Sequence, residues 1–489
     1  MFHHDMLMKA YSPEWPISHL ARPLRFFSFD FALANLIRVG REIFLRGLAM
    51  FWVYNIVTTL LFSALGPFAF LFLVIKGLVD QDFGERLGFV PAHLMGPKER
   101  GVRLWLHAVS IGEVKLAKVI VGAIREKGIR VVIILSTTTK SGRQTALSIM
   151  PPDTAVIYNP IDLLFCVRRA LKRASPDLFV NLETEIWPNF LWACKRLRIP
   201  VFLVNGRISV RSINRYKRAR FLMREVLSTY ASLSMISAPD AERILSMGAD
   251  PRRVVVGGNA KYDILGKEAN PELSRRIAAV YRVDRIRPVF IAGSTRGGEE
   301  EIIIEAYLNL RARYPTTVLI IAPRHVERCG TIEAILRSYD LGYCLRSSLE
   351  EGAGGGLPAD IILVDTFGEL FGIYSIGTIL FCGASLVPLG GQNPLEAAVW
   401  GKPVLYGPSM EDFLEAKALL EGVGAGFVVR DKEELVKTAT WLLDHPEESE
   451  RLGRRAREEI EGNRGSAKKQ VERVFRIFHE SRQCSEHSR

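Results

Sequence analysis

Short apolar runs recur along the chain from residue 102 onward, and helix-like or polar stretches separate each run from the next. Runs of this length, rich in Val, Ile, Leu and Phe, are typical of strands in βαβ units and predict parallel sheets. One set of runs lies between residues 102 and 258, and a second set lies between residues 288 and 430. The pattern predicts an α/β protein with two Rossmann-like lobes that face each other across a cleft.

Residues 47–75 carry no charged side chain, and a run of this length can cross the hydrocarbon core of a bilayer. Gly66 and Pro67 interrupt the run, so a kinked span or a re-entrant hairpin also fits, as does a buried core helix. The pattern predicts an N-terminal extension at 1–46, a membrane anchor at 47–75, a first lobe at 76–263, a hinge at 264–287, a second lobe at 288–465 and a C-terminal helix and tail at 466–489. We place the hinge at a polar stretch without a clear core pattern, and we expect the C-terminal helix to pack back on the first lobe.

The composition of the chain limits the classes of partner that it is expected to bind. The formal charge of +12 and the pI near 9.4 suit an anionic partner, either a nucleic acid or a membrane surface. The sequence resembles no nucleic-acid-binding module, so we expect a membrane and phosphorylated substrates rather than a nucleic acid. The six cysteines form no CxxC pair and the histidines are scattered, which predicts reduced thiols and no metal site.

Candidate catalytic groups of the first lobe follow its strands. Glu113 lies in HAVSIGE, where it could act as a general base, although its spacing from Ser110 also fits a helix-capping box. Glu183 and Glu185 follow a strand in NLETEIWPN, where a solvated loop is the simpler explanation. Lys261, in GGNAKYD, could steady an anionic group or be an ordinary surface lysine. A basic run at 207–224 suits lipid phosphates or a solvated helix face.

Polar loops follow the strands of the second lobe, which predicts a nucleotide site at one edge of its sheet. Ser294 and Thr295 lie where a helix begins and could cradle a phosphate, and Arg324 could pair with or stack on a nucleotide. The loop 383–394 runs into a helix predicted over Leu395 to Trp400, with Asn as its N-cap and Pro at its first position. Such a helix start suits an anion, and Glu396 could bind ribose hydroxyls. An ordinary strand–turn–helix crossover has the same pattern.

Nine blocks, in this order, resemble the bacterial Kdo (3-deoxy-D-manno-octulosonic acid) transferases of lipopolysaccharide synthesis. The blocks are GERLGF, HAVSIGE, ETEIWPN, NGRIS, GNAKYD, GSTRGGEEE, APRHVER, DTFGEL and GASLVPLGGQNPLEAA, and the resemblance spans residues 51–476. It implies a GT-B fold with an acceptor-binding first lobe and a donor-binding second lobe, anchored at the cytoplasmic side of the inner membrane. It also implies an inverting transfer of Kdo from CMP-Kdo to a lipid A precursor (lipid IVA), with no metal or dissociable cofactor.

The same resemblance assigns roles to individual residues. Glu113 falls on the family's proton acceptor, and Glu183 and Lys261 fall on positions that stabilise the transition state. The positions that bind the CMP portion are Pro323, Arg324, Phe367, Gly368, Glu369, Asn393, Pro394, Leu395 and Glu396. The chain departs from the family at Gln392 and Arg296, where His is usual, and both departures touch donor-side loops.

Two other functions fit the sequence. One is a different GT-B sugar-nucleotide enzyme, such as a lipid-linked glycosyltransferase or a soluble epimerase, and the apolar segment argues against the epimerase. The other is a membrane-anchored sugar-nucleotide- or lipid-binding protein without catalysis, which Gln392 motivates. The sequence leaves open the number of Kdo residues transferred, the acyl pattern of the acceptor, the topology of the apolar segment and the oligomeric state.

Overall fold

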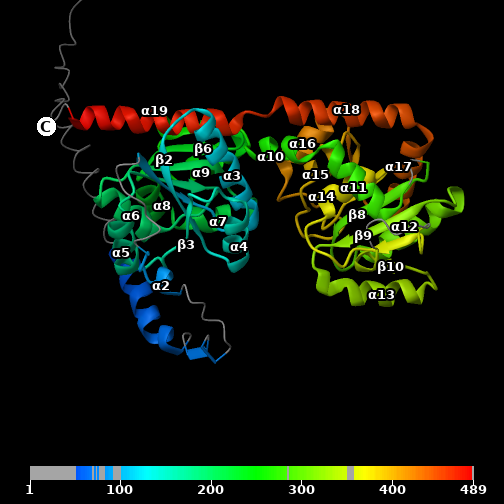
Figure 1. The fold of residues 1–489 in the computed structure, drawn as a ribbon, viewed down its shortest axis with the longest axis horizontal. Helices are drawn as coiled ribbons and strands as arrows, with labels where there is room; N and C mark the ends of the chain where they lie inside the picture. The colour runs from blue at the N-terminus through cyan, green and yellow to red at the C-terminus, as the bar shows by residue number, and fades with distance from the viewer. Residues whose placement is uncertain are drawn as a thin grey trace, which may run out of the picture. The chain divides into compact units, whose positions relative to one another are not determined.

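The computed structural model describes residues 51–68, 71–72, 74–75, 83–91, 101–283, 286–349 and 357–486 (Figure 1). The predicted N-terminal extension at 1–46 and the first residues of the predicted anchor lie outside the described residues.

The first lobe is built on a parallel sheet of seven strands in the order β3-β2-β1-β4-β5-β6-β7. The strands are β1 (Val102–His107), β2 (Val131–Thr137), β3 (Ala155–Tyr158), β4 (Leu178–Leu182), β5 (Val201–Gly206), β6 (Tyr230–Met235) and β7 (Val254–Val256). The helices are α2 (Phe83–Arg86), α3 (Ile111–Glu126), α4 (Lys140–Ile149), α5 (Leu164–Ala174), α6 (Pro188–Arg196), α7 (Val210–Arg218), α8 (Arg220–Leu227) and α9 (Ala238–Ser246).

The second lobe repeats this plan with the order β10-β11-β9-β8-β12-β13-β14, again with parallel pairing. The strands are β8 (Val289–Thr295), β9 (Val318–Pro323), β10 (Cys344–Leu345), β11 (Ile361–Leu363), β12 (Ile379–Cys382), β13 (Val404–Tyr406) and β14 (Gly426–Val428). The helices are α12 (Glu300–Arg313), α13 (Cys329–Ser338), α14 (Leu370–Ile373), α15 (Leu395–Ala398), α16 (Leu414–Gly422), α17 (Lys432–Asp444) and α18 (Pro446–Gly462). The predicted fold class is confirmed, and every apolar run used to predict it contains a strand.

Both faces of each sheet are covered, which explains why the strands read as continuous apolar runs. On β1, Trp105 packs edge-on against Phe190 on one face of the sheet. Its neighbours Leu104 and Leu106 join a separate core on the other face. Successive side chains of a strand point to opposite faces, so one short strand supplies both cores.

The polar stretch predicted as a hinge is largely helical. It contains the last five residues of α10 (Lys261–Glu268) and all of α11 (Pro271–Tyr281). The prediction that it lacks a core pattern is wrong, because Ile277, Val280 and Tyr281 are buried in the core of the second lobe. These three residues have the spacing i, i+3, i+4 of one helix face, but the charged residues before them conceal it.

The last helix returns to the first lobe, as the sequence predicts. Helix α19 (Ser466–Glu486) buries Val471, Val474, Phe475 and Phe478 in the core that also contains α3. Figure 1 shows α19 (red) along the first lobe and α18 along the second.

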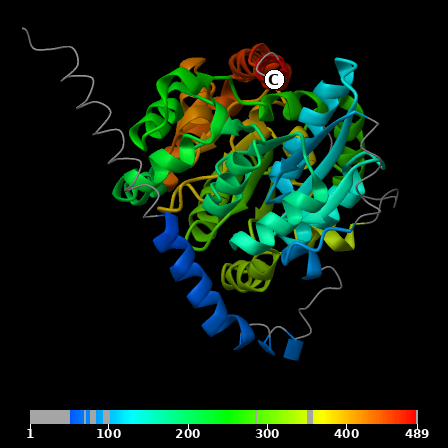
Figure 2. The ribbon, with the colours of Figure 1, turned by 90° about the vertical axis from the view of Figure 1, so that its left-hand side faces the viewer.

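The apolar N-terminal segment is a helix over Phe51–Phe68 that continues through Gly66 and Pro67. It is long and apolar enough to cross a membrane, and 11% of it is buried. Figures 1 and 2 show it (blue) extending away from the first lobe. Its first turns contact that lobe, because Phe51 stacks on Trp192 and the Tyr54 hydroxyl donates to Asp162.

Candidate active site

The strand order changes direction between β1 and β4 in the first lobe and between β8 and β12 in the second. Open α/β sheets bind ligands beyond the carboxyl ends of the strands at such points. Glu113 follows β1 and Glu183 follows β4, while Thr295 ends β8 and the loop 383–394 follows β12. The topology therefore brings the predicted catalytic and donor-side loops to the edges where a ligand is expected.

Glu113 lies in the first turn of α3, with only 8% of its surface exposed. Its carboxylate accepts hydrogen bonds from the Val109 backbone N–H at 2.8 Å and from the Ser110 hydroxyl at 3.1 Å. The Ser110 side chain makes no hydrogen bond to a helix N–H, so the reciprocal capping box is not formed. Local bonds hold Glu113 at the start of the helix, and it also borders a cavity.

Burial raises the pKa of the Glu113 carboxyl from 4.5 to about 7, and the nearby charges of Glu183 and Glu185 contribute to that rise. Burial and the charge of Glu183 also raise the pKa of Glu185. A carboxyl group with a pKa near neutral is suited to accept a proton at physiological pH.

Glu183 directly follows β4, and its backbone is left-handed, with φ of 55°. One of its carboxylate oxygens lies 2.5 Å from Nζ of Lys261. Lys261 begins α10, so the ion pair joins the end of β4 to the start of the segment that leaves the first lobe. The structure thus brings together two residues that lie 78 positions apart in the sequence.

Two cavities border these groups, and residues of both lobes line each one. A cavity of about 430 Å³ is lined by Glu113, Glu183 and Glu185 from the first lobe, and by Gly391 and Gln392 from the second. The loop after β12, including the departure at Gln392, therefore borders the same space as the candidate base.

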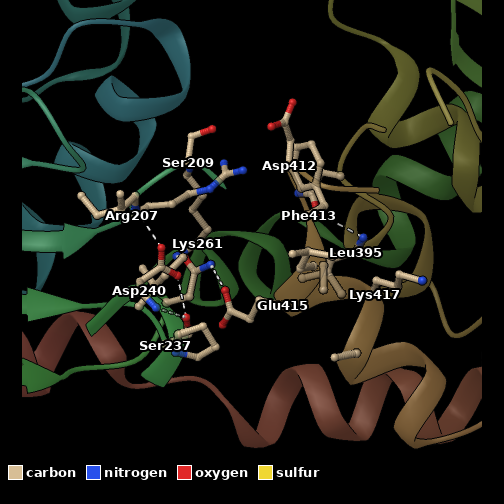
Figure 3. A pocket seen from close by; sticks show the side chains of 18 of the residues that line it. Arg207, Ser209, Ser237, Asp240, Lys261, Leu395, Asp412, Phe413, Glu415 and Lys417 are labelled. Atoms are coloured by element: carbon tan, nitrogen blue, oxygen red, sulfur yellow. Dashed lines mark hydrogen bonds between the residues drawn. The ribbon is translucent and has the colours of Figure 1, made fainter. Parts of the chain in front are cut away.

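The second cavity, of about 550 Å³, is lined by Glu183 and Lys261 together with Asn393 and Leu395 of the second lobe. Figure 3 shows Lys261 and Arg207 on the first-lobe side and Leu395 and Phe413 opposite them. Glu183 lines both cavities.

Direct contacts also cross the cleft beside the second cavity. Glu415 of α16 accepts hydrogen bonds from the Asn259 amide and the Tyr262 hydroxyl, each at 3.2 Å. The Arg207 guanidinium lies 5.3 Å from the ring centre of Phe413.

The loop after β12 differs from its prediction in two respects. Helix α15 covers Leu395–Ala398 only, so the helix predicted to reach Trp400 is too long, and Pro394 takes the N-cap position. Asn393 forms a local turn instead, in which its side-chain oxygen accepts from the Leu395 N–H at 3.2 Å. A helix of four residues has a small dipole, so any anion bound here would rely mainly on individual N–H groups and nearby cations.

Glu396 lies in α15 and Arg324 follows β9, and the charge of Arg324 acts on the Glu396 carboxyl in the folded chain. Burial raises the pKa of the Glu396 carboxyl, while the positive charges of Lys115 and Arg324 and a hydrogen bond from Asn393 oppose that rise. The charges of Arg324 and of Lys115 from the first lobe therefore both act on the Glu396 carboxyl.

The remaining predicted donor residues lie outside the linings of the two cavities. Glu369 accepts from Nε of Arg346 at 2.7 Å, and Phe367, two residues earlier, is 75% exposed. Thr295 is fully buried and donates to Glu300.

Residues 81–264 match the family model described as 3-deoxy-D-manno-octulosonic-acid transferase (kdotransferase). A 3-deoxy-D-manno-octulosonic acid transferase of Haemophilus influenzae is 32% identical over 394 residues, which cover 79% of this chain and 89% of that protein. The chain belongs to the Kdo transferase family. A transferase of the same name from Bordetella pertussis is 30% identical over 401 residues, covering 80% of this chain and 89% of that protein.

Solved structures place this Kdo transferase family member in the GT-B fold. A UDP-GlcNAc 2-epimerase from Neisseria meningitidis aligns with a TM-score of 0.55 and 15% identity, covering 78% of this chain and all of that one. A glycosyltransferase from Rickettsia africae gives the same TM-score and identity and covers 98% of that chain.

The sequence pattern did not predict one buried residue of this family member that joins two loops of the second lobe. Glu299, in the STRGGEEE block, is fully buried, and its carboxylate accepts four backbone N–H groups, from Arg296 and from residues 384, 385 and 386. It therefore joins the loop after β8 to the loop after β12. The acidic residues of this block predict the start of a helix, but nothing in the sequence indicates a hydrogen bond to a loop 85 residues away.

Proposed function

We propose that this chain is an inverting glycosyltransferase that moves Kdo from CMP-Kdo to a hydroxyl group of a lipid A precursor in lipopolysaccharide synthesis. Family membership supports the donor and the acceptor class. The observation that carries the catalytic role is the buried Glu113 carboxyl, with a pKa of about 7, in a cavity shared with Glu183 and lined by both lobes.

The proposed reaction is a single displacement. The acceptor hydroxyl attacks the anomeric carbon of Kdo while Glu113 accepts its proton, and the bond from that carbon to the phosphate oxygen breaks. The electron pair leaves with CMP. No protein nucleophile is needed, because the anomeric centre inverts in one step.

Charge develops at two places during this step. The anomeric carbon gains positive character, which the Glu183 carboxylate can offset from its position beside the cavity. Lys261 pairs with Glu183 at 2.5 Å, which fixes the position of this carboxylate beside the cavity.

The departing CMP gains negative charge on the donor side. We assign its binding to the residues predicted from the family pattern in the loops after β9, β11 and β12. Arg324 and the N–H groups near Asn393 are suited to the phosphate, and Glu396 is suited to the ribose.

The lipid acceptor requires access to a bilayer, and we assign that role to the helix Phe51–Phe68. Its side chains beyond the first turns include exposed apolar residues such as Ile56, Leu60 and Leu65. We place the enzyme at the inner membrane with its lobes on the cytoplasmic side. A lobe fixed to this helix would meet an acceptor held in the same membrane.

Incubation of purified protein with CMP-Kdo and a tetraacyl disaccharide bisphosphate, followed by mass spectrometry of the lipid, tests this proposal. We expect a mass gain of one or more Kdo units, which Glu113→Ala abolishes and Glu472→Ala, an exposed change on α19, leaves intact. Absence of any gain with the unaltered chain would overturn the proposal. Binding of CMP-Kdo without transfer would instead favour the non-catalytic binding protein that Gln392 motivates.

A further inference from the structure

Two neighbouring strands of the first sheet end in left-handed residues that are not glycine. Glu183 follows β4 with φ of 55°, and Asn205 lies in β5 with φ of 58°, where the pairing between β5 and β6 shifts register. A left-handed backbone is unfavourable for a non-glycine residue, although Asn tolerates it better than most. Glu183 has a proposed role at the reacting centre, whereas the left-handed backbone of Asn205 has no role in the proposed reaction.

The buried Asn205 side chain holds the segment that carries Lys261. Its oxygen accepts a hydrogen bond from the Ala260 N–H at 2.8 Å, and Ala260 is the residue just before α10. Lys261 is the first residue of that helix and pairs with Glu183. Asn205 therefore fixes the backbone from which the Lys261 side chain reaches the cavity.

Gln470 of the C-terminal helix completes the connection. Its side-chain oxygen accepts from the Asn205 N–H at 2.7 Å, and its amide donates to the Gly258 carbonyl at 2.9 Å. Gln470 is 2% exposed, and a Cβ on Gly257 would lie 3.0 Å from its side chain, so the fit is close. One side chain, 265 residues away in sequence, bridges the end of β5 and the loop before Lys261.

The start of α19 is fixed to the same segment. The Asp263 carboxylate of α10 accepts the backbone N–H of Ala467 at 2.9 Å and also that of Gly465. Helix α19 is thus bonded to the segment 258–263 at two places, one on each side of Lys261.

We infer that Asn205 and Gln470 are positioning residues of the transferase, which set the Lys261–Glu183 ion pair through the backbone of residues 258–261. The C-terminal helix is then part of the active-site scaffold as well as of the core. This inference rests on the proposed function for its kinetic consequences, but the bridge itself can be measured without it.

The variant Gln470→Met removes both hydrogen bonds while keeping a side chain of similar length against Gly257. Arg473→Met is the matched control, because Arg473 lies on the same helix and bonds to Ser232 of β6 at 2.8 Å, away from Lys261. Asn205→Gly keeps the left-handed backbone available and removes the acceptor for the Ala260 N–H.

Hydrogen exchange measured by mass spectrometry tests the bridge in the full-length protein. We expect Gln470→Met and Asn205→Gly to accelerate exchange in the peptide that covers 257–263, and Arg473→Met to leave that peptide unchanged. Unchanged exchange in the first two variants would overturn the inference, even if the chain proved to be no transferase.

Kinetics test the consequence for catalysis. A displaced ion pair should lower kcat by about 10-fold, with the KM for CMP-Kdo changed less than about 2-fold. In a Lys261→Ala background, Gln470→Met should lower kcat less than about 2-fold further, because both changes then act on the same interaction. An equal loss in both backgrounds, or a loss matched by Arg473→Met, would show that Gln470 acts only on the stability of the fold.

Discussion

Replacement of Glu113 by glutamine tests activity and stability at once, because the same burial affects both. Burial and the charges of Glu183 and Glu185 raise the pKa of this carboxyl from 4.5 to about 7. At about 1.4 kcal/mol per pH unit, the ionised group destabilises the folded protein by about 3 kcal/mol. The folded pKa lies above the unfolded one, so this cost is absent below pH 4.5, grows between pH 4.5 and 7, and is complete above pH 7.

The amide introduced by Glu113→Gln cannot ionise, so this substitution should remove that cost. We expect the free energy of unfolding to rise by up to about 3 kcal/mol at pH 8 and to change little at pH 4. The amide cannot take up a proton from the attacking hydroxyl, so kcat should fall by about 10²- to 10⁴-fold. Greater stability together with lost activity is the signature of a buried base.

Urea unfolding followed by tryptophan fluorescence at pH 4, 6 and 8 gives the stabilities, and kcat/KM from pH 5 to 9 gives the activity profile. In the unaltered enzyme, kcat/KM should fall below a pKa near 7. Glu472→Gln on α19 is the control, because it removes an exposed carboxylate away from both cavities. An acid limb near pH 4.5, or a Glu113→Gln variant no more stable at pH 8 than the native chain, would refute the reasoning.

Three further substitutions address other groups of the site. Glu185→Gln removes a negative charge that raises the pKa of Glu113, so the acid limb of kcat/KM should move to lower pH, and an unmoved limb would contradict this. Glu299→Gln leaves one acceptor oxygen for four backbone N–H groups, so the KM for CMP-Kdo should rise by about 10-fold while lipid KM stays within about 2-fold. Gln392→His should change the KM for CMP-Kdo more than the KM for lipid, and an effect confined to the lipid would count against a donor-side role.

The fold could be predicted because its signal is local. Each buried strand is a short apolar run with helical segments on either side, and parallel strands buried on both faces leave little ambiguity. β10, with two residues, fell below the length that a pattern can detect. In α11, the charged residues of the exposed face conceal Ile277, Val280 and Tyr281, so the buried face was missed.

The site could be predicted only in part, because its pKa values and hydrogen bonds depend on residues that are far apart in the sequence. Glu113 stood out by its place after a strand, but its pKa is raised by burial and by the charges of Glu183 and Glu185, which act on it only in the folded chain. The same limit applies to Glu299 and to Gln470, whose partners lie 85 and 265 residues away. Spacing within a motif identifies groups that can do chemistry, and long-range hydrogen bonds decide how those groups are held.

Several of these long-range bonds involve residues at strand ends whose backbone is left-handed and which face the proposed site. Among the described residues, the non-glycine positions with positive φ at such ends are Glu183, Asn205, Ser294 and Ala384. Each lies at the carboxyl end of a strand that borders or adjoins a point where the strand order reverses. Glycine would adopt these angles without strain but would supply no carboxylate at 183 and no acceptor at 205.

Three of these four left-handed residues are held by a bond to a distant residue: Glu183 to Lys261, Asn205 to Gln470 and Ala384 to Glu299. The strain is therefore tolerated where a side chain or a loop must face the cleft, and the residues that stabilise it belong to the site as much as the residues that line it.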